Sequence, residues 1–363
     1  MTEPDAALRE ALRAVTRGAP LSREETRAAF EAALEESASP VLVAGLLAAL
    51  AAAGETSDVL AGVVDVLSAR ALRPPVGDAL AARAVDVCGT GGDGLGTFNV
   101  STAAAFVVAG AGVPVAKHGN RAVSSACGSA DVLAALGVDV EMAPARAAEA
   151  LESAGVTFLF APLYHAAMRR VAAVRRELGV RTVFNLAGPL SNPLGVTRQI
   201  VGVDRPERVE LLARALLARG TRRAFVFSNV AGGDELLPLG TTRIAEVAGG
   251  AVRIFEVSAA DFGVAEGEAE KFGGGAPARN AEILTRVLEG ERGTQRATVL
   301  MNASAALVAA GAVDDFRDGV TLAERSIDGG AAKESLWRLI AISRGSGAAT
   351  SRDDDAVSSG SAR

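Results

Sequence analysis

The chain has 363 residues, of which 49% are hydrophobic and 22% charged, and its formal net charge is −6. This composition predicts a globular protein with one large domain or two ordinary ones, and with enough apolar material for a core. Basic residues are scattered among acidic ones without a long Lys/Arg block, so we expect no nucleic-acid partner. Small molecules are the expected partners.

The cysteines and the apolar segments exclude further classes. Cys88 and Cys127 are too few for a disulfide framework and lie in no metal-binding Cys/His pattern, which suits a reducing cytoplasm. The opening residues MTEPDAALRE lack the basic and apolar regions of a signal peptide. The longest apolar windows, such as residues 41–54, are too short to span a bilayer. We therefore expect a cytoplasmic protein with no membrane partner.

Residues 1–73 predict a small all-helical domain. Apolar residues recur at three- and four-residue spacing through LREALRAV, as in an amphipathic helix. Ser22 and Glu25 have the spacing of a capping box. Ser39 followed by Pro40 is a typical start of the next helix.

From residue 76 onward, short β-branched runs alternate with alanine-rich helical patterns. This alternation predicts an α/β domain over residues 76–163 and 191–344, with a mostly parallel central sheet flanked by helices. The basic helical segment 164–190 interrupts the alternation and is expected to pack on the helical domain. The Ser-, Gly- and Asp-rich tail 345–363 is expected to be disordered. Strands are predicted at 84–87, 113–116, 138–140, 157–160 and 224–227.

Five glycines lie between an apolar run and a Ser-Thr pair in DVCGTGGDGLGTFNVST, residues 86–102. A glycine costs roughly 0.5–1 kcal/mol relative to alanine in regular structure, so this cluster indicates a backbone shaped for a ligand. The order of strand, glycine loop and helix N-terminus directs free N–H groups to one point, as phosphate binding requires. Neither common glycine-rich nucleotide motif is matched, and glycines also build ordinary strand–helix turns.

A second loop of this kind follows the next predicted strand. The string KHGNR, residues 117–121, comes directly after the apolar run VPVA, and SS and GSAD follow it. Two loops suited to phosphate after neighbouring strands favour a ligand with several phosphate groups.

The motifs in their order resemble the anthranilate phosphoribosyltransferase family. The resemblance rests on GTGGD, TFNVST, KHGNR, SS and GSAD, then on FLFAPLYHAAMRRVAAVRRELGVRTVFNLAGPLSNP and GGDEL, and it extends to about residue 343. It implies a glycosyltransferase of tryptophan biosynthesis, which moves the phosphoribosyl group of phosphoribosyl pyrophosphate (PRPP) to the amine of anthranilate. It also implies Mg²⁺ as the cofactor and a homodimer formed through the helical domain.

The resemblance assigns both loops to PRPP. The lysine of KHGNR is a compact cation suited to a phosphate charge, and the glycines let the backbone approach the ligand closely. The residues assigned to PRPP are Gly89, Gly92, Asp93, Thr97, Asn99, Val100, Ser101, Thr102, Lys117, His118, Gly119, Asn120, Arg121, Ser124, Ser125 and Ser129.

Magnesium is assigned by the resemblance to Asp234, Glu235 and Ser101. Adjacent acidic residues are usually surface groups, but hard oxygen ligands shared with phosphates are what Mg²⁺ prefers. Neutralising the leaving pyrophosphate would be the main task of such a metal.

Anthranilate is assigned to Gly89, Asn120, His165 and Arg175, with Arg175 as the cation for its carboxylate. Arg175 lies in a basic helical stretch whose other arginines are expected to be mostly solvated. Lys117 and Arg175 are the residues predicted to act in catalysis. No nucleophilic side chain is needed, because positioning and charge stabilisation carry a transfer of this kind.

The sequence departs from the usual family pattern at three places, namely Ala166, Ala187 and residues 228–230 (SNV). Two alternatives to the main interpretation can be compared with the motifs. A pyrimidine nucleoside phosphorylase would carry KHSTGG in the first loop, where this chain has VCG followed by TGG. A catalytically silent binding relative would show erosion of the loop and metal residues, and neither set is eroded.

Overall fold

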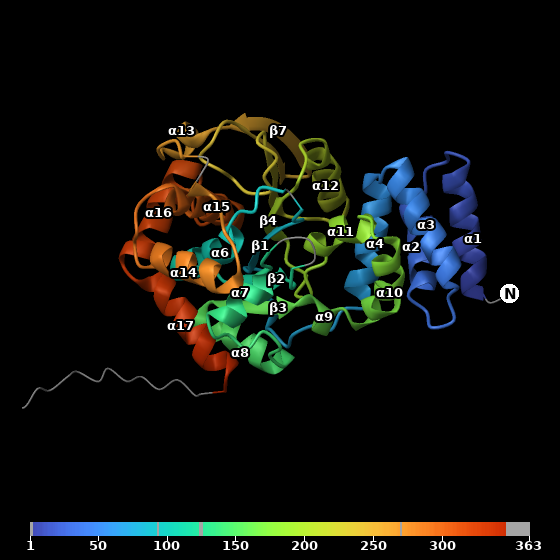
Figure 1. Ribbon diagram of the computed structural model, residues 1–363, viewed down its shortest axis with the longest axis horizontal. Coiled ribbons are helices and arrows are strands. Elements are labelled where there is room, and N and C mark those ends of the chain that lie inside the picture. Colours follow the sequence, from blue (N-terminus) through green and yellow to red (C-terminus); the bar gives the residue numbers. More distant parts are fainter. Residues whose placement is uncertain (1–2, 93, 123–125, 269–270, 346–363) are drawn as a thin grey trace, which may run out of the picture.

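The computed structural model describes residues 3–92, 94–122, 126–268 and 271–345. Figure 1 shows a layer of helices beside a larger part built around a sheet, which confirms the predicted fold class. Of the tail 345–363 that is predicted to be disordered, residues 346–363 lie outside the described residues. The layer contains α1 (Glu3–Thr16), α2 (Arg23–Ala33), α3 (Pro40–Ala53) and α4 (Ser57–Ala69).

The predicted helix starts are confirmed. The Glu25 N–H donates to Ser22 Oγ at 3.2 Å and the Ser22 N–H donates to Glu25 Oε2 at 2.8 Å, which completes the capping box of α2. Pro40 is the first residue of α3. Among the described residues, no helix is both long and apolar enough to cross a bilayer.

The segment that interrupts the strand–helix alternation packs on these helices. It forms α9 (Ala161–Tyr164), α10 (Arg169–Leu178) and α11 (Val183–Ala187), and α10 contacts α3 while α11 contacts α4. Val171 and Phe184 share an apolar core with Leu46 of the helical layer. The Arg170 guanidinium donates to Leu34 O at 2.9 Å, so the attachment is polar as well as apolar.

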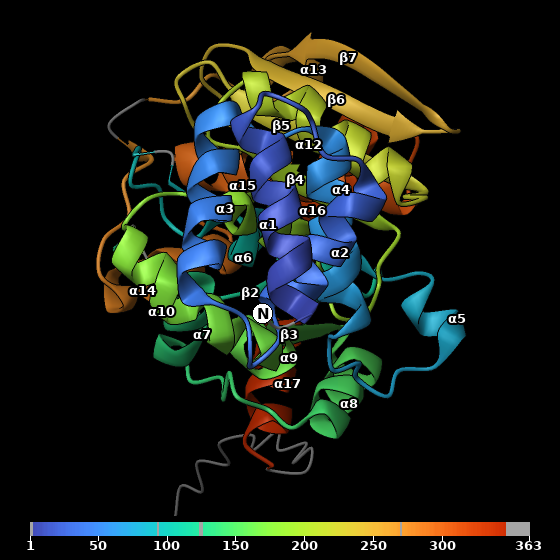
Figure 2. The ribbon, with the colours of Figure 1, turned by 90° about the vertical axis from the view of Figure 1, so that its right-hand side faces the viewer.

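The central sheet has seven strands in the order β3-β2-β1-β4-β5-β6-β7. The first five strands of that order are parallel, and β6 and β7 complete one edge as antiparallel strands (Figure 2). The strands are β1 (Val85–Gly89), β2 (Val115–Gly119), β3 (Val156–Phe160), β4 (Arg198–Gly202), β5 (Arg223–Asn229), β6 (Thr242–Ala248) and β7 (Ala251–Val257).

Four of the five predicted strands correspond to β1, β2, β3 and β5, with ends that differ by at most three residues. The strand predicted at 138–140 is wrong. Val138 and Val140 are buried in the connection after α7 (Ser129–Ala135), and the Asp139 N–H donates to Ser343 Oγ at 3.0 Å instead of to a neighbouring strand. The apolar run therefore reflects burial of a connection and not sheet pairing.

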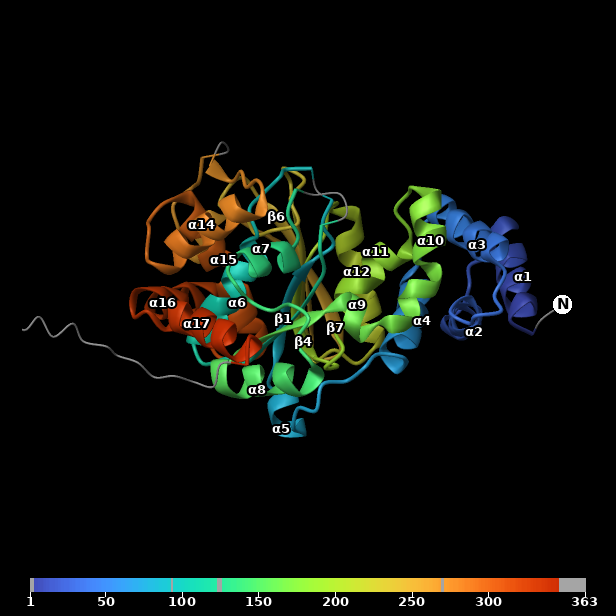
Figure 3. The same cartoon turned by 60° about the horizontal axis from the view of Figure 1, so that its bottom comes forward.

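Helices cover both faces of the sheet (Figure 3). Phe225 and Phe227 of β5 face a core shared with α6, whereas Ala224 and Val226 face the core shared with the helical layer. This period of two places one apolar face on each side, as expected for buried parallel strands. The covering helices include α6 (Val100–Gly110), α8 (Pro144–Ala154), α12 (Glu207–Ala218), α14 (Pro277–Leu288), α15 (Thr294–Ala310), α16 (Phe316–Asp328) and α17 (Ala331–Ser343).

Candidate active site

The loops after β1, β4 and β5 meet at one edge of the sheet. The Thr90 N–H donates to Gly202 O at 2.9 Å, which joins the ends of β1 and β4. A Cβ atom at Gly202 would lie 1.6 Å from Asp234 O, and one at Gly89 would lie 2.5 Å from Asp234 Oδ2. These two glycines therefore let the Asp234 loop enter between the strand ends, where ligands bind in sheets of this kind.

The acidic pair contacts the glycine loop and the start of α6. Asp234 and Glu235 are only 9% and 8% exposed. The Gly91 N–H donates to Asp234 Oδ2 at 2.7 Å, and the Ser101 N–H donates to Glu235 Oε1 at 3.2 Å. The N–H groups of the loop and of the helix N-terminus thus form an anion site, which the two carboxylates contact in this structure.

The loop that carries the acidic pair is shaped by Asn229. Its side-chain amide donates to Leu239 O at 2.9 Å and to Thr242 Oγ1 at 3.0 Å, and its Oδ1 accepts the N–H of Ala231 at 2.9 Å. Asn229 belongs to the SNV stretch that departs from the family pattern. The loop is therefore held by hydrogen bonds of the departing residue itself.

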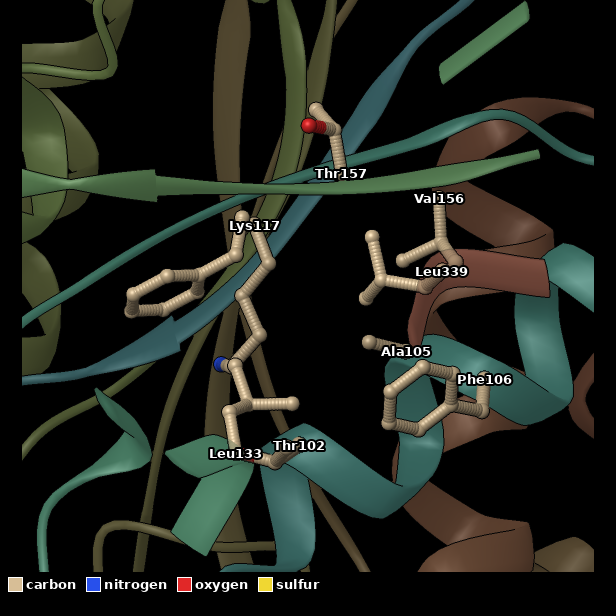
Figure 4. A pocket seen from close by; sticks show the side chains of 9 residues that line it. Thr102, Ala105, Phe106, Lys117, Leu133, Val156, Thr157 and Leu339 are labelled. Atoms are coloured by element: carbon tan, nitrogen blue, oxygen red, sulfur yellow. The ribbon is translucent and has the colours of Figure 1, made fainter. Parts of the chain in front are cut away.

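Lys117 lies beneath both loops. Its ammonium donates to Val87 O at 2.5 Å and to Ser101 Oγ at 3.2 Å, although the side chain is only 4% exposed. Figure 4 shows this side chain extending from β2 toward Thr102 at the start of α6, beside a small cavity whose other side is lined by Phe106. Burial lowers the pKa of Lys117, and the negative charge of nearby Asp86 opposes that shift.

Asp86 is a fully buried carboxylate between β1 and β2. It accepts the N–H of His118 at 3.1 Å and the Asn192 side-chain amide at 2.8 Å. Asn192 also donates to Ala116 O at 2.8 Å. Burial raises the pKa of Asp86 to about 6, while the charge of Lys117 and these hydrogen bonds act in the opposite direction.

His118 and His165 face each other with ring centroids 5.1 Å apart. The His165 Nε2 donates to Ser191 O at 2.9 Å. Burial is the first cause that lowers the pKa of both rings, to about 3 for His118. Both imidazoles are therefore neutral near pH 7 and offer polar, uncharged walls.

The start of α6 is tied to a distant segment. The Asn280 side-chain amide donates to Asn99 Oδ1 at 2.9 Å, and the Asn99 amide donates to Cys127 O at 3.2 Å. Thr97 forms an isolated bridge with Gly273. Two residues predicted to bind PRPP, Thr97 and Asn99, are therefore positioned by α14 and by the segment that leads into it.

Hydrogen bonds join the start of the second loop to the start of α7. Ser129 Oγ donates to Asn120 O at 3.3 Å, and the Arg121 guanidinium donates to Asp131 Oδ1 at 3.2 Å. Arg121 also lies over the Phe160 ring, 5.7 Å from its centroid. A Cβ at Gly119 would lie 2.2 Å from Ser129 Oγ, so this close packing requires glycine.

Arg175 lies in the last turn of α10, with its guanidinium 5.3 Å from the centroid of the Phe184 ring. Burial lowers the pKa of Arg175. A partly desolvated guanidinium beside an aromatic face suits a ligand that is both aromatic and anionic.

The remaining predicted residues differ in what they can contribute. Val100 points its side chain into the core, and Thr102 is 1% exposed with no hydrogen-bond partner for its Oγ1 among the described residues. Gly92 has a φ of +77°, which favours glycine. Asp93, Ser124 and Ser125 lie outside the described residues.

Comparison with known proteins identifies the family. Residues 81–333 match the family described as "Glycosyl transferase family, a/b domain", and residues 9–71 match its helical bundle domain. Anthranilate phosphoribosyltransferase of Chelativorans sp. is 48% identical over 329 residues, which cover 91% of this chain and 96% of that protein. The enzyme of Anaeromyxobacter sp. (strain Fw109-5) is 49% identical over 90% of this chain and 95% of its own length. The chain belongs to the anthranilate phosphoribosyltransferase family.

Solved structures agree with this family. The anthranilate phosphoribosyltransferase of Thermus thermophilus has a TM-score of 0.86 and 42% identity, and the match covers 92% of this chain and 99% of that one. The enzyme of Saccharomyces cerevisiae, solved in complex with PRPP and Mg, has a TM-score of 0.83 and 28% identity over 94% of this chain and 99% of its own. The fold described above is thus that of an anthranilate phosphoribosyltransferase.

The residues present fit a magnesium ion that is shared with a phosphate ligand. Asp234 and Glu235 present carboxylates at the N–H groups of Gly91 and Ser101, which form the anion site of the loop. Among the described residues, no group of three His, Cys, Asp or Glu side chains could hold a metal. Mg²⁺ is usually bound by one or two carboxylates together with waters and substrate phosphates, which is the donor set that Asp234 and Glu235 would share with a phosphate ligand.

Sequence reasoning missed several residues that build this site. Asp86 stands inside the quoted glycine string, where its position predicts only a strand residue. Asn192 stands in the quoted string that ends in GPLSNP, where the resemblance assigns it no role. Asn280 and Gly202 lie outside the quoted motifs, so no sequence signal marks them. Arg181 belongs to the stretch whose arginines are expected to be solvated, although its Nη1 donates to Gly91 O at 2.9 Å.

Proposed function

We propose that this chain transfers the phosphoribosyl group of PRPP to the amine of anthranilate and releases pyrophosphate. The observation that carries the proposal is the meeting of glycine loop, acidic pair and buried lysine at one sheet edge, in a chain of this family. The first loop has no counterpart of the lysine-bearing phosphorylase motif, so the phosphorylase alternative has no support.

The PRPP site is assigned to the two loops. The N–H groups of Gly91 and Ser101 bind the carboxylate oxygens of Asp234 and Glu235, so the backbone of this loop and of the helix start suits oxygen anions such as phosphate, and the buried Lys117 adds a positive charge. Asp234, Glu235 and Ser101 would hold Mg²⁺, which when bound supplies positive charge to the leaving pyrophosphate. The buried setting strengthens each of these interactions relative to water.

The anthranilate site is assigned to Gly89, Asn120, His165 and Arg175. Arg175 can hold a carboxylate by two parallel hydrogen bonds, and Phe184 beneath it offers an aromatic wall. The imidazole of His165 is neutral and does not protonate the substrate amine, so the amine lone pair stays available for attack. Positioning of the two substrates then supplies the main part of the rate enhancement.

We further propose that the chain works in the cytoplasm as a homodimer formed through the helical domain of residues 1–73 and 164–190. Val41 on α3 is 79% exposed, and an exposed apolar side chain there is compatible with a covered interface. The α/β domain would then consist of residues 76–163 and 191–344.

One assay tests the reaction. The full chain is mixed with anthranilate, PRPP and Mg²⁺, and the loss of the aromatic amine is followed. Turnover that stops when Mg²⁺ is chelated supports the proposal. Turnover of uridine and phosphate without turnover of anthranilate would overturn it in favour of the phosphorylase.

The assignment of Arg175 is tested in the same assay. Arg175→Ala should raise the KM for anthranilate by one to two orders of magnitude, if about 1.5–3 kcal/mol of a charge-assisted interaction is lost. The KM for PRPP should change little. An effect mainly on PRPP would place Arg175 in the other site.

A further inference from the structure

Arg181 joins the anthranilate-side segment to the glycine loop. It lies between α10 and α11, and its Nη1 donates to Gly91 O at 2.9 Å. The N–H of the same Gly91 donates to Asp234 Oδ2 at 2.7 Å. Gly91 has a φ of +62°, and both of its backbone polar groups are bound by side chains from other segments. One residue of the PRPP loop is therefore held between a proposed metal ligand and the anthranilate-side segment.

A gain in the stability of the fold does not explain why Arg181 lies at this position. Its Nε and Nη2 atoms are buried and have no hydrogen-bond acceptor among the described residues. Asp204 Oδ1 lies 3.9 Å from Nη2, but the Asp204 carboxylate accepts two hydrogen bonds from Arg208, at 2.7 and 2.9 Å. Buried donors without acceptors destabilise a fold, and proteins tolerate that cost chiefly at functional sites.

We propose that Arg181 is a positioning residue that couples binding of the two substrates by fixing Gly91. The inference rests on the proposed function, because it assigns the two sides of Gly91 to PRPP and anthranilate. Movement of Arg181 or of Asp234 alters the geometry of the Gly91 peptide, and the altered peptide in turn changes the contact with the other residue. Loss of the Arg181 contact should therefore weaken the binding of each substrate, even in the absence of the other.

Three arginine variants separate this role from simple substrate binding. Arg181→Met should raise the KM for both substrates, each by about tenfold, as expected for loss of one charge-assisted hydrogen bond. Arg175→Met should raise the KM for anthranilate alone. Arg176→Met is the matched control, because Arg176 is exposed on the same helix as Arg175, and it should change neither constant.

Equilibrium binding gives a second readout that is independent of turnover. Calorimetric titration with PRPP and Mg²⁺, without anthranilate, should show about tenfold weaker binding for Arg181→Met. Arg181→Lys keeps one donor and should recover part of the loss; it also carries the test if the Met variant does not fold. A lower melting temperature with unchanged PRPP affinity would overturn the proposal, because that is the result of a merely structural role.

Measurements on the unmodified chain distinguish a failure of this inference from a failure of the proposed function. If the unmodified chain binds PRPP but does not convert anthranilate, the proposed function fails and the calorimetric comparison still decides whether Arg181 fixes the loop. If the unmodified chain turns over and Arg181→Met affects anthranilate alone, the coupling fails while the proposed function stands.

Discussion

Strand β1 is held to its two neighbours in different ways. On the β4 side, a ladder of five register pairs runs from Val85↔Arg198 to Gly89↔Gly202. On the β2 side, the register among the described residues is Val85↔Val115, and side chains take over beyond it. There Asp86 accepts the His118 N–H, and Lys117 donates to Val87 O.

The difference shows two ways to build a binding edge from parallel strands. The β4 side relies on backbone pairing and glycines, so that the Asp234 loop can lie directly against the strand ends. The β2 side places a carboxylate, an ammonium and an imidazole in the buried space near the phosphate loops. We therefore expect the β4 side to be sensitive to substitutions that add side-chain volume. We expect the β2 side to be sensitive to substitutions that change a charge, and to pH.

The largest effect is expected on the β4 side, from loss of the acidic pair. The double variant Asp234→Ala/Glu235→Ala should lower kcat/KM by about a thousandfold, which corresponds to about 4 kcal/mol of transition-state stabilisation. Steady-state kinetics at saturating Mg²⁺ measures the loss. The control Glu256→Ala/Glu324→Ala removes two exposed acids and should leave kcat/KM unchanged. Near-normal activity of the first variant would show that these acids do not hold the metal.

A single methyl group tests the close packing on the same side. Gly202→Ala would place its Cβ 1.6 Å from Asp234 O, a backbone atom that can move only with its loop. Overpacking of this kind typically costs about 1–3 kcal/mol, so we expect a clear loss of stability in urea unfolding together with loss of turnover. Gly77→Ala is the control, because nothing lies within 4 Å of its Cβ position. Equal behaviour of the two variants would contradict the packing argument.

The same contrast explains what could be predicted from the sequence. The glycine loop, the KHGNR loop and the acidic pair are contiguous motifs, so their residue types and order indicate their chemistry without a structure. Asp86 and Asn192 are 106 residues apart, and Asn99 and Asn280 are 181 residues apart. Contacts of that kind follow from the strand order, which local patterns do not determine.

Local sequence patterns also limited the prediction of the strands. Four of the five parallel strands were predicted, because burial of both faces gives continuous apolar runs. The parallel strand β4 was missed, since its sequence RQIVG begins with two polar residues, and β6 was missed as well. β7 is mostly exposed, so it lacks such a run and was missed. The apolar run at 138–140 was misinterpreted because a buried connection has the same composition as a buried strand.

On the β2 side, the largest effect is expected from Asp86→Asn. The amide has one acceptor oxygen where the carboxylate has two, so it would present a donor either to the Asn192 amide or to the His118 N–H, and Lys117 would lose its compensating charge. Breaking a buried charge pair typically costs about 3–5 kcal/mol. Burial already disfavours the Asp86 charge, as its raised pKa indicates, so we expect the lower end. Urea unfolding at pH 7.5 measures the change, with exposed Asp78→Asn as control. A stability equal to that of the unmodified chain would show that the site does not need this charge.

The smallest predicted effect is a change in the pH dependence of stability, caused by His118. Its folded pKa of about 3 lies below the unfolded value of roughly 6.5, because burial disfavours the charged ring. Between these values the unfolded chain binds the proton and the folded chain does not, so this contribution to stability is complete above about pH 6.5 and is lost as the pH falls. Asp86, with a raised pKa of about 6, acts in the opposite sense over the upper part of the same range.

His118→Gln removes the histidine contribution and leaves that of Asp86. From pH 4.5 to 6, the free energy of unfolding of the variant should rise less steeply than that of the unmodified chain, by about 1.4 kcal/mol per pH unit for one proton. Urea unfolding at three pH values within this range gives the two slopes. His165, the other of the two histidines in the chain, also has a lowered pKa, so His165→Gln should change the slope in the same direction. Parallel curves for His118→Gln and the unmodified chain would mean that the ring is protonated equally in both states, which its burial against His165 forbids.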